Sequence, residues 1–362
     1  MSAHAGVKTK VRWPEAAADY EELRVVTGRR SGVTIAIAVH STTLGPALGG
    51  ARLWHYESPA EGIEDALRLA RAMTYKAAAA GLDLGGGKGV ICAPTPAAPE
   101  GDLRRAMLLD FGDAVASLGG KYVTAEDVGT GAADMAVIAE RTSHVVGLPD
   151  ERGGSGDPSP VTARGVMTAL RACLEHRTGD PSVAGARVCV VGAGHVGSRL
   201  ARLLAGAGAE VTIADLDPRR RALAVELGAR WMEPREALLA DCDVLTPCAL
   251  GGAIDASMVD RLRCDIVCGA ANNVLAEDRI AVDLTRRGIA YAPDFIANAG
   301  GLISVYAELH RLDRKGVADL VDHIGTTIRL VLEAAERHGT TPLAEAQAIA
   351  LQRLRGGTAA AA

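Results

Sequence analysis

The chain has 362 residues, which is long for a single hydrophobic core and favours two domains. Hydrophobic residues make up 48% of it and charged residues 23%, a balance typical of a folded globular protein and not of a disordered one. The formal net charge is −5, so we expect neither nucleic acid nor an acidic membrane surface as a partner.

The start of the chain is polar and basic and lacks the apolar segment of a secretory signal. No run of about eighteen apolar residues, the length that spans a bilayer, occurs anywhere. We therefore expect a cytoplasmic protein that does not enter a membrane.

Seven cysteines are scattered along the chain, mostly inside apolar runs where cysteine acts as a small buried side chain. Their spacing, including that of Cys264 and Cys268, does not reproduce the pair of pairs of a zinc site. No metal is expected.

The first half of the chain is expected to alternate strands and helices. Residues 32–41 alternate apolar and small side chains, which predicts a strand. Residues 59–80 have apolar side chains at steps of three and four and a proline in the first turn, which predicts a helix. Met73 and Lys76 share one face of that helix. Residues 102–118 predict a second amphipathic helix.

Lys88 follows three consecutive glycines, Gly85–Gly87, and opens an apolar run. Glycines in a row suggest a loop against which a ligand lies closely, and a lysine leaving that loop would point into the same space. Desolvation and the nearby charge of Lys76 would lower its pKa and make it a candidate general base. The alternative is an ordinary turn with one exposed lysine.

Two further features of this half could serve the same site. Gly49 and Gly50 stand beside apolar residues and can offer backbone N–H groups to an anion. Asp127 stands where a strand ends and a glycine-containing loop begins, a common place for a catalytic carboxylate. It could equally cap the helix that follows.

A nucleotide-binding pattern begins after residues 149–160, a polar segment rich in glycine and proline that predicts an interdomain linker. Residues 186–217 predict a strand, a glycine-rich turn, a helix and a second strand that ends at Asp215. Such a turn lets a pyrophosphate approach the helix N-terminus, and the acid accepts hydrogen bonds from the adenosine ribose. The turn consists of Gly192, Ala193, Gly194, His195, Val196 and Gly197.

Asp215 favours NAD over NADP, because a carboxylate repels a 2′-phosphate. Arg219–Arg221 could in principle hold such a phosphate, but they are more in keeping with the solvated face of the next helix. Short strands then alternate with helices, which predicts a doubly wound parallel sheet. Asn272 and Asn298 would lie at the carboxyl ends of its strands, where they could bond a nicotinamide or merely satisfy a turn.

Several motifs occur in a fixed order along the chain. They are LGPALGGARLW, MTYKAAAAGLDLGGGKGVI, TAEDVGTG, GDPSPVTARGV, the glycine fingerprint, GAANNVL and PDFIANAGGLISV. With these motifs the chain resembles the glutamate/leucine/phenylalanine/valine dehydrogenase superfamily, and most closely its bacterial leucine and valine dehydrogenases. The resemblance spans roughly residues 33 to 310, and its lysine motif with the glycine triplet is highly specific.

The resemblance implies NAD-dependent, reversible oxidative deamination of an L-amino acid to the 2-oxo acid and ammonia. By motif position, Lys76 and the backbone of Gly49 and Gly50 would hold the substrate carboxylate. Lys88 would be the base that activates water, and Asp127 would shuttle protons to and from the nitrogen.

The family also implies that Asn272 contacts substrate and cofactor, and that Thr162 lines the nicotinamide pocket. The substrate side chain would lie in an apolar pocket, which favours valine, leucine or isoleucine over glutamate. Phenylalanine remains an alternative substrate, as does a non-catalytic sensor of amino acids or nucleotides. The expected substrate contacts besides Lys76 and the glycines are Leu48, Met73, Ala125, Leu302 and Val305.

The expected architecture is therefore α/β with two domains and a cleft between them. Residues 1–152, with about 322–355 packing back, would form the catalytic and oligomerisation domain. Residues 153–321 would form a Rossmann NAD-binding domain. A homo-oligomer is expected, as is usual for such enzymes.

Overall fold

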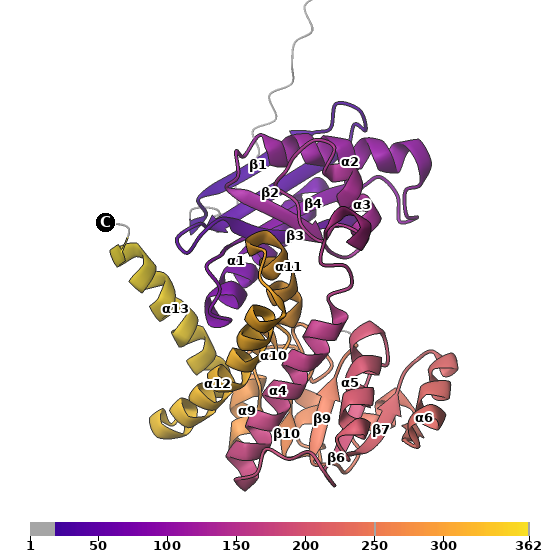
Figure 1. Ribbon diagram of the computed structural model, residues 1–362, viewed down its shortest axis with the longest axis vertical. Coiled ribbons are helices and arrows are strands. Elements are labelled where there is room, and N and C mark those ends of the chain that lie inside the picture. The colour runs from indigo at the N-terminus through magenta and orange to yellow at the C-terminus, as the bar shows by residue number, and fades with distance from the viewer. Residues whose placement is uncertain (1–18, 250, 361–362) are drawn as a thin grey trace, which may run out of the picture.

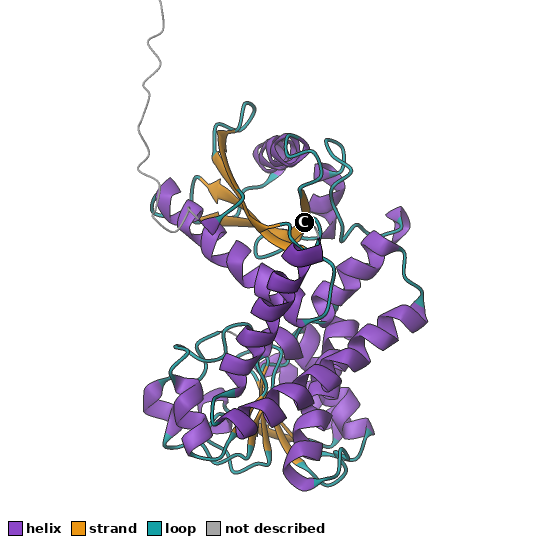
Figure 2. Cartoon of the chain, turned by 90° about the vertical axis from the view of Figure 1, so that its left-hand side faces the viewer, coloured by secondary structure: helices purple, strands orange, loops and turns teal. Residues whose placement is uncertain are grey.

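The computed structural model describes residues 19–249 and 251–360, so the polar leader at the start of the chain lies outside the described residues. Two lobes, each built around one sheet, lie at opposite ends of the long axis (Figure 1). The view turned by 90° shows a waist between the two sheets that is crossed by helices (Figure 2). This arrangement confirms the predicted α/β class with a sheet in each half of the chain.

The first lobe holds a mixed five-stranded sheet in the order β1-β2-β4-β3-β5. Strand β2 pairs antiparallel with β1 and β4, whereas β3 runs parallel to both β4 and β5. Its elements are β1 (Glu22–Thr27), β2 (Thr34–Ser41), β3 (Ala47–His55), α1 (Pro59–Ala79), β4 (Gly85–Ala93), α2 (Gly101–Ala116), β5 (Tyr122–Glu126) and α3 (Ala132–Ile138).

Strand β2 shows why this sheet is covered on both faces. Ala36 and Ala38 pack in the cluster that contains apolar residues of α1, whereas Ile35 and Ile37 pack in the cluster that contains those of α2. Successive side chains of a strand point to opposite faces, so the two helices cover opposite sides of the sheet. Small residues face α1, which lets that helix approach the strands closely.

The glycine triplet differs from its prediction, because Gly85, Gly86 and Gly87 belong to strand β4 and form no loop. A Cβ atom on Gly86 would lie 2.1 Å from the backbone nitrogen of Thr74, on α1. One on Gly87 would lie 2.6 Å from the ring of Tyr122. The glycines are therefore required by close packing inside the protein. The close approach that the sequence indicates is real, but Gly86 meets helix α1 and Gly87 meets Tyr122 on β5, so groups of the protein itself account for it.

The second lobe holds a parallel six-stranded sheet in the order β11-β10-β9-β6-β7-β8. The order reverses beside β6, which is the doubly wound arrangement predicted from the sequence. Its elements are β6 (Arg187–Val191), α5 (His195–Gly206), β7 (Glu210–Ala214), η3 (Pro218–Arg220), α6 (Arg221–Leu227), β8 (Arg230–Met232), α7 (Pro234–Ala237), β9 (Val244–Pro247), α8 (Ala256–Val259), β10 (Ile266–Val267), α9 (Ile280–Arg286) and β11 (Ala290–Tyr291).

The remaining helices connect the lobes. Helix α12 packs on α4, and the C-terminal helix α13 returns to lie against α1. Arg353, on α13, donates to the carbonyl of Leu82 at 2.6 Å and pairs with Asp83 at 2.7 Å, just beyond the end of α1. These connecting elements are η2 (Asp150–Arg152), α4 (Ser159–Thr178), α10 (Asp294–Ala297), α11 (Gly300–His310), α12 (Arg314–His338) and α13 (Pro342–Ala360).

None of the helices within residues 19–249 and 251–360 is both long and apolar enough to cross a membrane.

Candidate active site

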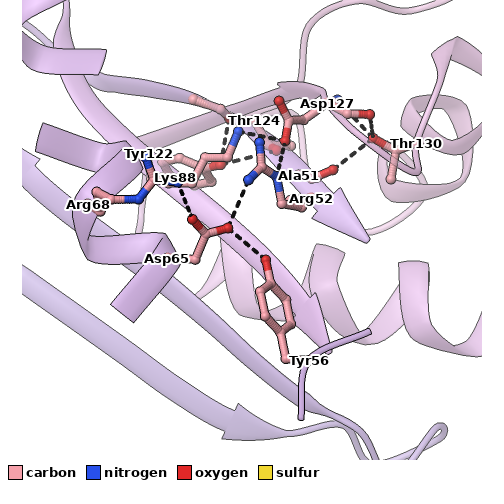
Figure 3. A network of polar contacts seen from close by, with 11 residues as sticks. Ala51, Arg52, Tyr56, Asp65, Arg68, Lys88, Tyr122, Thr124, Asp127 and Thr130 are labelled. Atoms are coloured by element: carbon pink, nitrogen blue, oxygen red, sulfur yellow. Dashed lines mark hydrogen bonds and ion pairs between the residues drawn. The ribbon is translucent and has the colours of Figure 1, made fainter. Parts of the chain in front are cut away.

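Lys88 and Asp127 form an ion pair inside the first lobe. Nζ of Lys88 lies 2.9 Å from Oδ2 of Asp127, and Lys88 is only 4% exposed (Figure 3). Lys88 comes from β4, and Asp127 is the first residue after β5. Both β4 and β5 run parallel to β3, which lies between them. The sheet therefore brings together the two groups that the sequence predicts as base and proton carrier.

Both simpler interpretations of these two residues are wrong. Lys88 is not an exposed lysine of a turn, since it is buried within a strand. Asp127 does not cap the next helix, because α3 begins after Gly131 and the side chain of Asp134 accepts from the Gly131 N–H at 2.9 Å. The Asp127 carboxylate is left for Lys88 and one further partner.

Burial and charge act against each other in this pair. Burial lowers the pKa of Lys88 below its ordinary value, although the attraction of Asp127 opposes the shift. Burial alone would raise the pKa of Asp127, but the cations of Lys88 and Arg52 outweigh it and hold that pKa below its usual value. The result is a lysine that gives up its proton more easily than a solvated one, next to an ionised carboxylate.

The second partner of Asp127 is Arg52, which our sequence analysis did not single out. Nε of Arg52 donates to Oδ2 of Asp127 at 2.8 Å, and Nη1 of Arg52 donates to Asp65, on α1, at 2.8 Å. A charged residue inside the apolar strand β3 was the available signal, because such a residue needs a buried partner.

Lys76 joins the two lobes. Its Nζ donates to Oδ1 of Asn298, between α10 and α11, at 2.6 Å. Nδ2 of Asn298 in turn donates to Oδ1 of Asn272 at 2.8 Å. Burial lowers the pKa of Lys76 to about 8, with Lys88 acting in the same direction and Asp294 against it. The structure thus places both predicted asparagines in contact and connects them to a predicted substrate-binding lysine.

The predicted apolar and glycine contacts of the substrate come from four elements, namely β3, β5, α1 and α11. Leu48, Gly49 and Gly50 lie on β3, and the register with β5 places Gly50 opposite Ala125. A Cβ on Gly50 would lie 2.6 Å from the Cβ of Asp127, so a larger residue would collide with the ion-paired aspartate. Leu48, Ala125, Leu302 and Val305 are buried in one apolar cluster with Met73 packed against it.

The glycine-rich turn follows β6 as predicted and is shaped to admit a dinucleotide. Gly192 has φ +106°, and a Cβ on Gly197 would lie 1.8 Å from the Gly192 carbonyl oxygen. A Cβ on Gly194 would meet no atom within 4 Å. The first and third glycines are therefore required by the turn itself, whereas the second leaves open space where a pyrophosphate can approach.

Asp215 lies at the end of β7 beside this turn. Its Oδ2 accepts from the backbone N–H of Ala193 at 2.6 Å, and its Oδ1 accepts from that of Asp217 at 2.8 Å. His195 and Val196 begin α5 within the same turn. Thr162 is buried on α4, and its hydroxyl donates to the Pro158 carbonyl at 3.0 Å.

Within the described ranges 19–249 and 251–360, no three side chains of histidine, cysteine, aspartate or glutamate gather in a way that would hold an ion.

Family models match both halves of the chain. "Glu/Leu/Phe/Val dehydrogenase, dimerisation domain" matches residues 20–144, and "Glutamate/Leucine/Phenylalanine/Valine dehydrogenase" matches residues 217–360. A third model, "D-isomer specific 2-hydroxyacid dehydrogenase, NAD binding domain", matches residues 165–261. The third model covers the glycine-rich turn and Asp215.

Individual relatives cover nearly the whole chain. Leucine dehydrogenase of Thermoactinomyces intermedius is 44% identical over 93% of this chain and 91% of its own. Valine dehydrogenase of Streptomyces virginiae is 43% identical over 92% of this chain and 94% of its own. The crystal structure of L-tryptophan dehydrogenase from Nostoc punctiforme has a TM-score of 0.82 at 34% identity and covers 94% of this chain and 97% of that one. The chain therefore belongs to the glutamate/leucine/phenylalanine/valine dehydrogenase family.

Proposed function

We propose that the chain is an NAD-dependent dehydrogenase of branched-chain L-amino acids, namely leucine, valine and isoleucine. The observation that carries this proposal is the buried Lys88–Asp127 pair, which adjoins Lys76 and an apolar cluster. The similarity to leucine and valine dehydrogenases over more than nine-tenths of the chain supports the same conclusion.

The reaction converts an L-amino acid, NAD⁺ and water into a 2-oxo acid, ammonium, NADH and one proton. When bound, NAD⁺ accepts the hydride that leaves Cα of the amino acid. The resulting imine is attacked at carbon by water, and the C–N bond then breaks to release ammonia. Hydride can leave only from the neutral amine, so the site must remove protons in a defined order.

The ionisable residues suit these steps. Nζ of Lys88, with its lowered pKa, takes a proton from the water that attacks the imine carbon. Asp127 exchanges protons with the substrate nitrogen. Lys76 and the backbone N–H groups of Gly49 and Gly50 hold the substrate carboxylate, which fixes Cα for the transfer.

The second lobe would supply the cofactor site. The turn from Gly192 to Gly197 would hold the pyrophosphate at the N-terminus of α5, and Asp215 would bind the adenosine ribose. Thr162 would lie beside the nicotinamide, and Asn272 would contact both cofactor and substrate. In this proposal the second lobe holds the cofactor, residues of both lobes contact the amino acid, and the reacting atoms meet between the lobes.

The substrate class follows from the lining of the pocket. Leu48, Met73, Ala125, Leu302 and Val305 are apolar and carry no group that could pair with a glutamate side chain. A branched aliphatic side chain gains from burial there, whereas a carboxylate loses hydration without compensation.

We further propose that the chain works in the cytoplasm as a homo-oligomer. Residues up to 152, with the C-terminal helices from about 322 to 355, would form the catalytic and assembly domain, and residues 153–321 the cofactor domain. A match to a model described as a dimerisation domain supports assembly through the first lobe. Light scattering of the purified protein measures the mass in solution.

The experiment that tests the function is NADH formation over a panel of L-amino acids. Leucine, valine and isoleucine should give the highest kcat/KM, phenylalanine and tryptophan lower values, and glutamate none. Preference for an aromatic substrate would replace the proposed substrate class, and the absence of NADH formation with every amino acid would favour a sensor.

A further inference from the structure

A single oxygen of Asp127 is shared between two cations. Oδ2 lies 2.9 Å from Nζ of Lys88 and 2.8 Å from Nε of Arg52, from β4 and β3 respectively (Figure 3). Within the described part of the chain, Oδ1 accepts no hydrogen bond. The two oxygens of this carboxylate are therefore not equivalent, because one is fixed by two donors and the other is left for a ligand.

Arg52 is itself held in place by α1. Its Nη1 donates to Oδ2 of Asp65 at 2.8 Å, and the hydroxyl of Tyr56 donates to the same oxygen at 2.8 Å. Arg68 occupies the other oxygen of Asp65 at 2.6 Å. Three donors therefore hold the Asp65 carboxylate in place. Arg52 contacts Asp65 through one nitrogen and Asp127 through another, so the rotation of its guanidinium group and its distance from Asp127 are both restricted.

We propose that Arg52 is a positioning residue for the deamination reaction, which holds Oδ2 of Asp127 so that Oδ1 is the atom that exchanges protons with the substrate nitrogen. This inference rests on the proposed function. Arg52 touches neither substrate nor cofactor in this account and acts through Asp127.

Arg52 also affects Lys88, the proposed base. Arg52 competes with Lys88 for Oδ2, and its charge acts with burial to lower the pKa of Lys88. The charged groups around Lys88 are Asp127 after β5, Arg52 on β3, and Asp65 and Lys76 on α1. Two of these four are cations, and only Arg52 among them both contacts Asp127 and stays protonated at every working pH.

A purely structural role is the rival explanation, in which Arg52 ties β3 to α1 through Asp65. Loss of that tie would lower stability and activity together without moving the pH at which Lys88 loses its proton. Loss of a positioning charge would raise that pH, because Asp127 would then stabilise the protonated lysine without competition. The pH profile therefore separates the two explanations.

The experiment compares Arg52→Gln, Arg52→Lys and the parent protein by the pH profile of kcat/KM for L-leucine oxidation. Arg52→Gln should lower kcat on the order of 10²-fold, as expected for a misplaced catalytic group. The ascending limb of its pH profile of kcat/KM should move to higher pH by about one unit. In Arg52→Lys the ascending limb should lie close to that of the parent protein, because the positive charge is kept. Its kcat should still be lower than that of the parent protein, since one ammonium cannot span both carboxylates.

Arg30→Gln is the matched control. Arg30 also bridges two aspartates of the first lobe, Asp110 and Asp113, each within 2.8 Å, and it contacts neither Lys88 nor Asp127. Its loss should leave the limb in place. An unmoved limb in Arg52→Gln, with kcat lowered only as far as in Arg30→Gln, would overturn the inference. A parent protein that forms no NADH would instead refute the proposed function.

Chemical rescue tests the inference even if Arg52→Gln folds poorly. Arg52 lines an open surface cleft of about 560 Å³, together with Trp54, Tyr56, Asp65 and Arg68, so small solutes can reach the space it occupies. In Arg52→Ala, free guanidinium ions should raise kcat at least tenfold. They should also return the ascending limb of the pH profile toward its position in the parent protein. Restored thermal stability without restored kcat would show a structural role and contradict the proposal.

Discussion

Nζ of Lys76 donates to Oδ1 of Asn298 at 2.6 Å, so the lysine proposed to bind the substrate carboxylate is already held by the opposite lobe. Lys76 lies on α1, which packs on the first sheet, whereas Asn298 precedes α11 and also contacts Asn272. A carboxylate that reaches Lys76 would compete with Asn298 for the ammonium group. Under the proposed role of Lys76, substrate binding and contact between the lobes would be coupled through one side chain.

Lys76 should make the free energy of unfolding of the unliganded protein increase with pH in the alkaline range. Its pKa of about 8 in the folded protein is below the ordinary value of 10.5, so between these values the unfolded chain binds more protons. The free energy of unfolding should then gain a rising contribution as pH increases through this window. In Lys76→Met that contribution is lost, and the difference is measured by urea unfolding at both ends of the window.

The exposed Lys121 provides the control, because Lys121→Met removes a lysine from the same lobe without touching the buried site. This variant should retain the rise between pH 8 and pH 10.5 that Lys76 produces. Identical pH profiles for Lys76→Met and the parent protein would mean that Lys76 titrates as a solvated lysine.

The fold and much of the site follow from local sequence. Spacing predicts α1 and the turn before α5, and glycines with an acid after β7 predict the nucleotide-binding lobe. The charge of Arg52 inside an apolar strand signals a buried partner, but neither the identity of that partner nor the packing role of Gly86 could be predicted in this way. Both depend on which strands become neighbours, and the order β2-β4-β3-β5 is a property of the complete sheet.

Contacts between residues far apart in the chain are the other features that local sequence does not predict. Lys76 and Asn298 are 222 positions apart in the chain, and Arg353 on α13 reaches Leu82 just beyond the end of α1. Periodicity shows that each helix has a buried face but not which helix covers it. The choice of partner is set by tertiary packing.

Enlarging the apolar pocket should shift the substrate preference toward aromatic amino acids. Ala125→Gly and Val305→Ala each remove buried carbon atoms from the cluster around Leu48. The ratio of kcat/KM for L-phenylalanine to that for L-leucine should rise at least about 10-fold in the double variant, since even one methylene in an apolar pocket is worth about 1 to 3 kcal/mol. An equal loss on both substrates would place these residues outside the side-chain pocket.

Asp215 should discriminate between the two nicotinamide dinucleotides. Asp215→Ser removes the negative charge that would repel a 2′-phosphate. It also removes the carboxylate that accepts from the Ala193 N–H in the glycine-rich turn. The KM for NAD⁺ should rise about 10- to 100-fold, while the KM for L-leucine changes little, because one charged hydrogen bond is worth about 1.5 to 3 kcal/mol. The preference for NAD⁺ over NADP⁺ should fall, and an unchanged preference would assign that role to another residue.

The proposed role of Lys88 as the base is tested by turnover of L-leucine by Lys88→Ala at saturating NAD⁺, with NAD⁺ binding measured by calorimetry. Asp127 keeps Arg52 as a partner in this variant, so the fold should survive. We expect kcat to fall by about 10² to 10⁴, the usual contribution of a general base, while the Kd for NAD⁺ stays within a factor of about two. Turnover close to that of the parent protein, with the same Kd, would contradict the proposed role of Lys88.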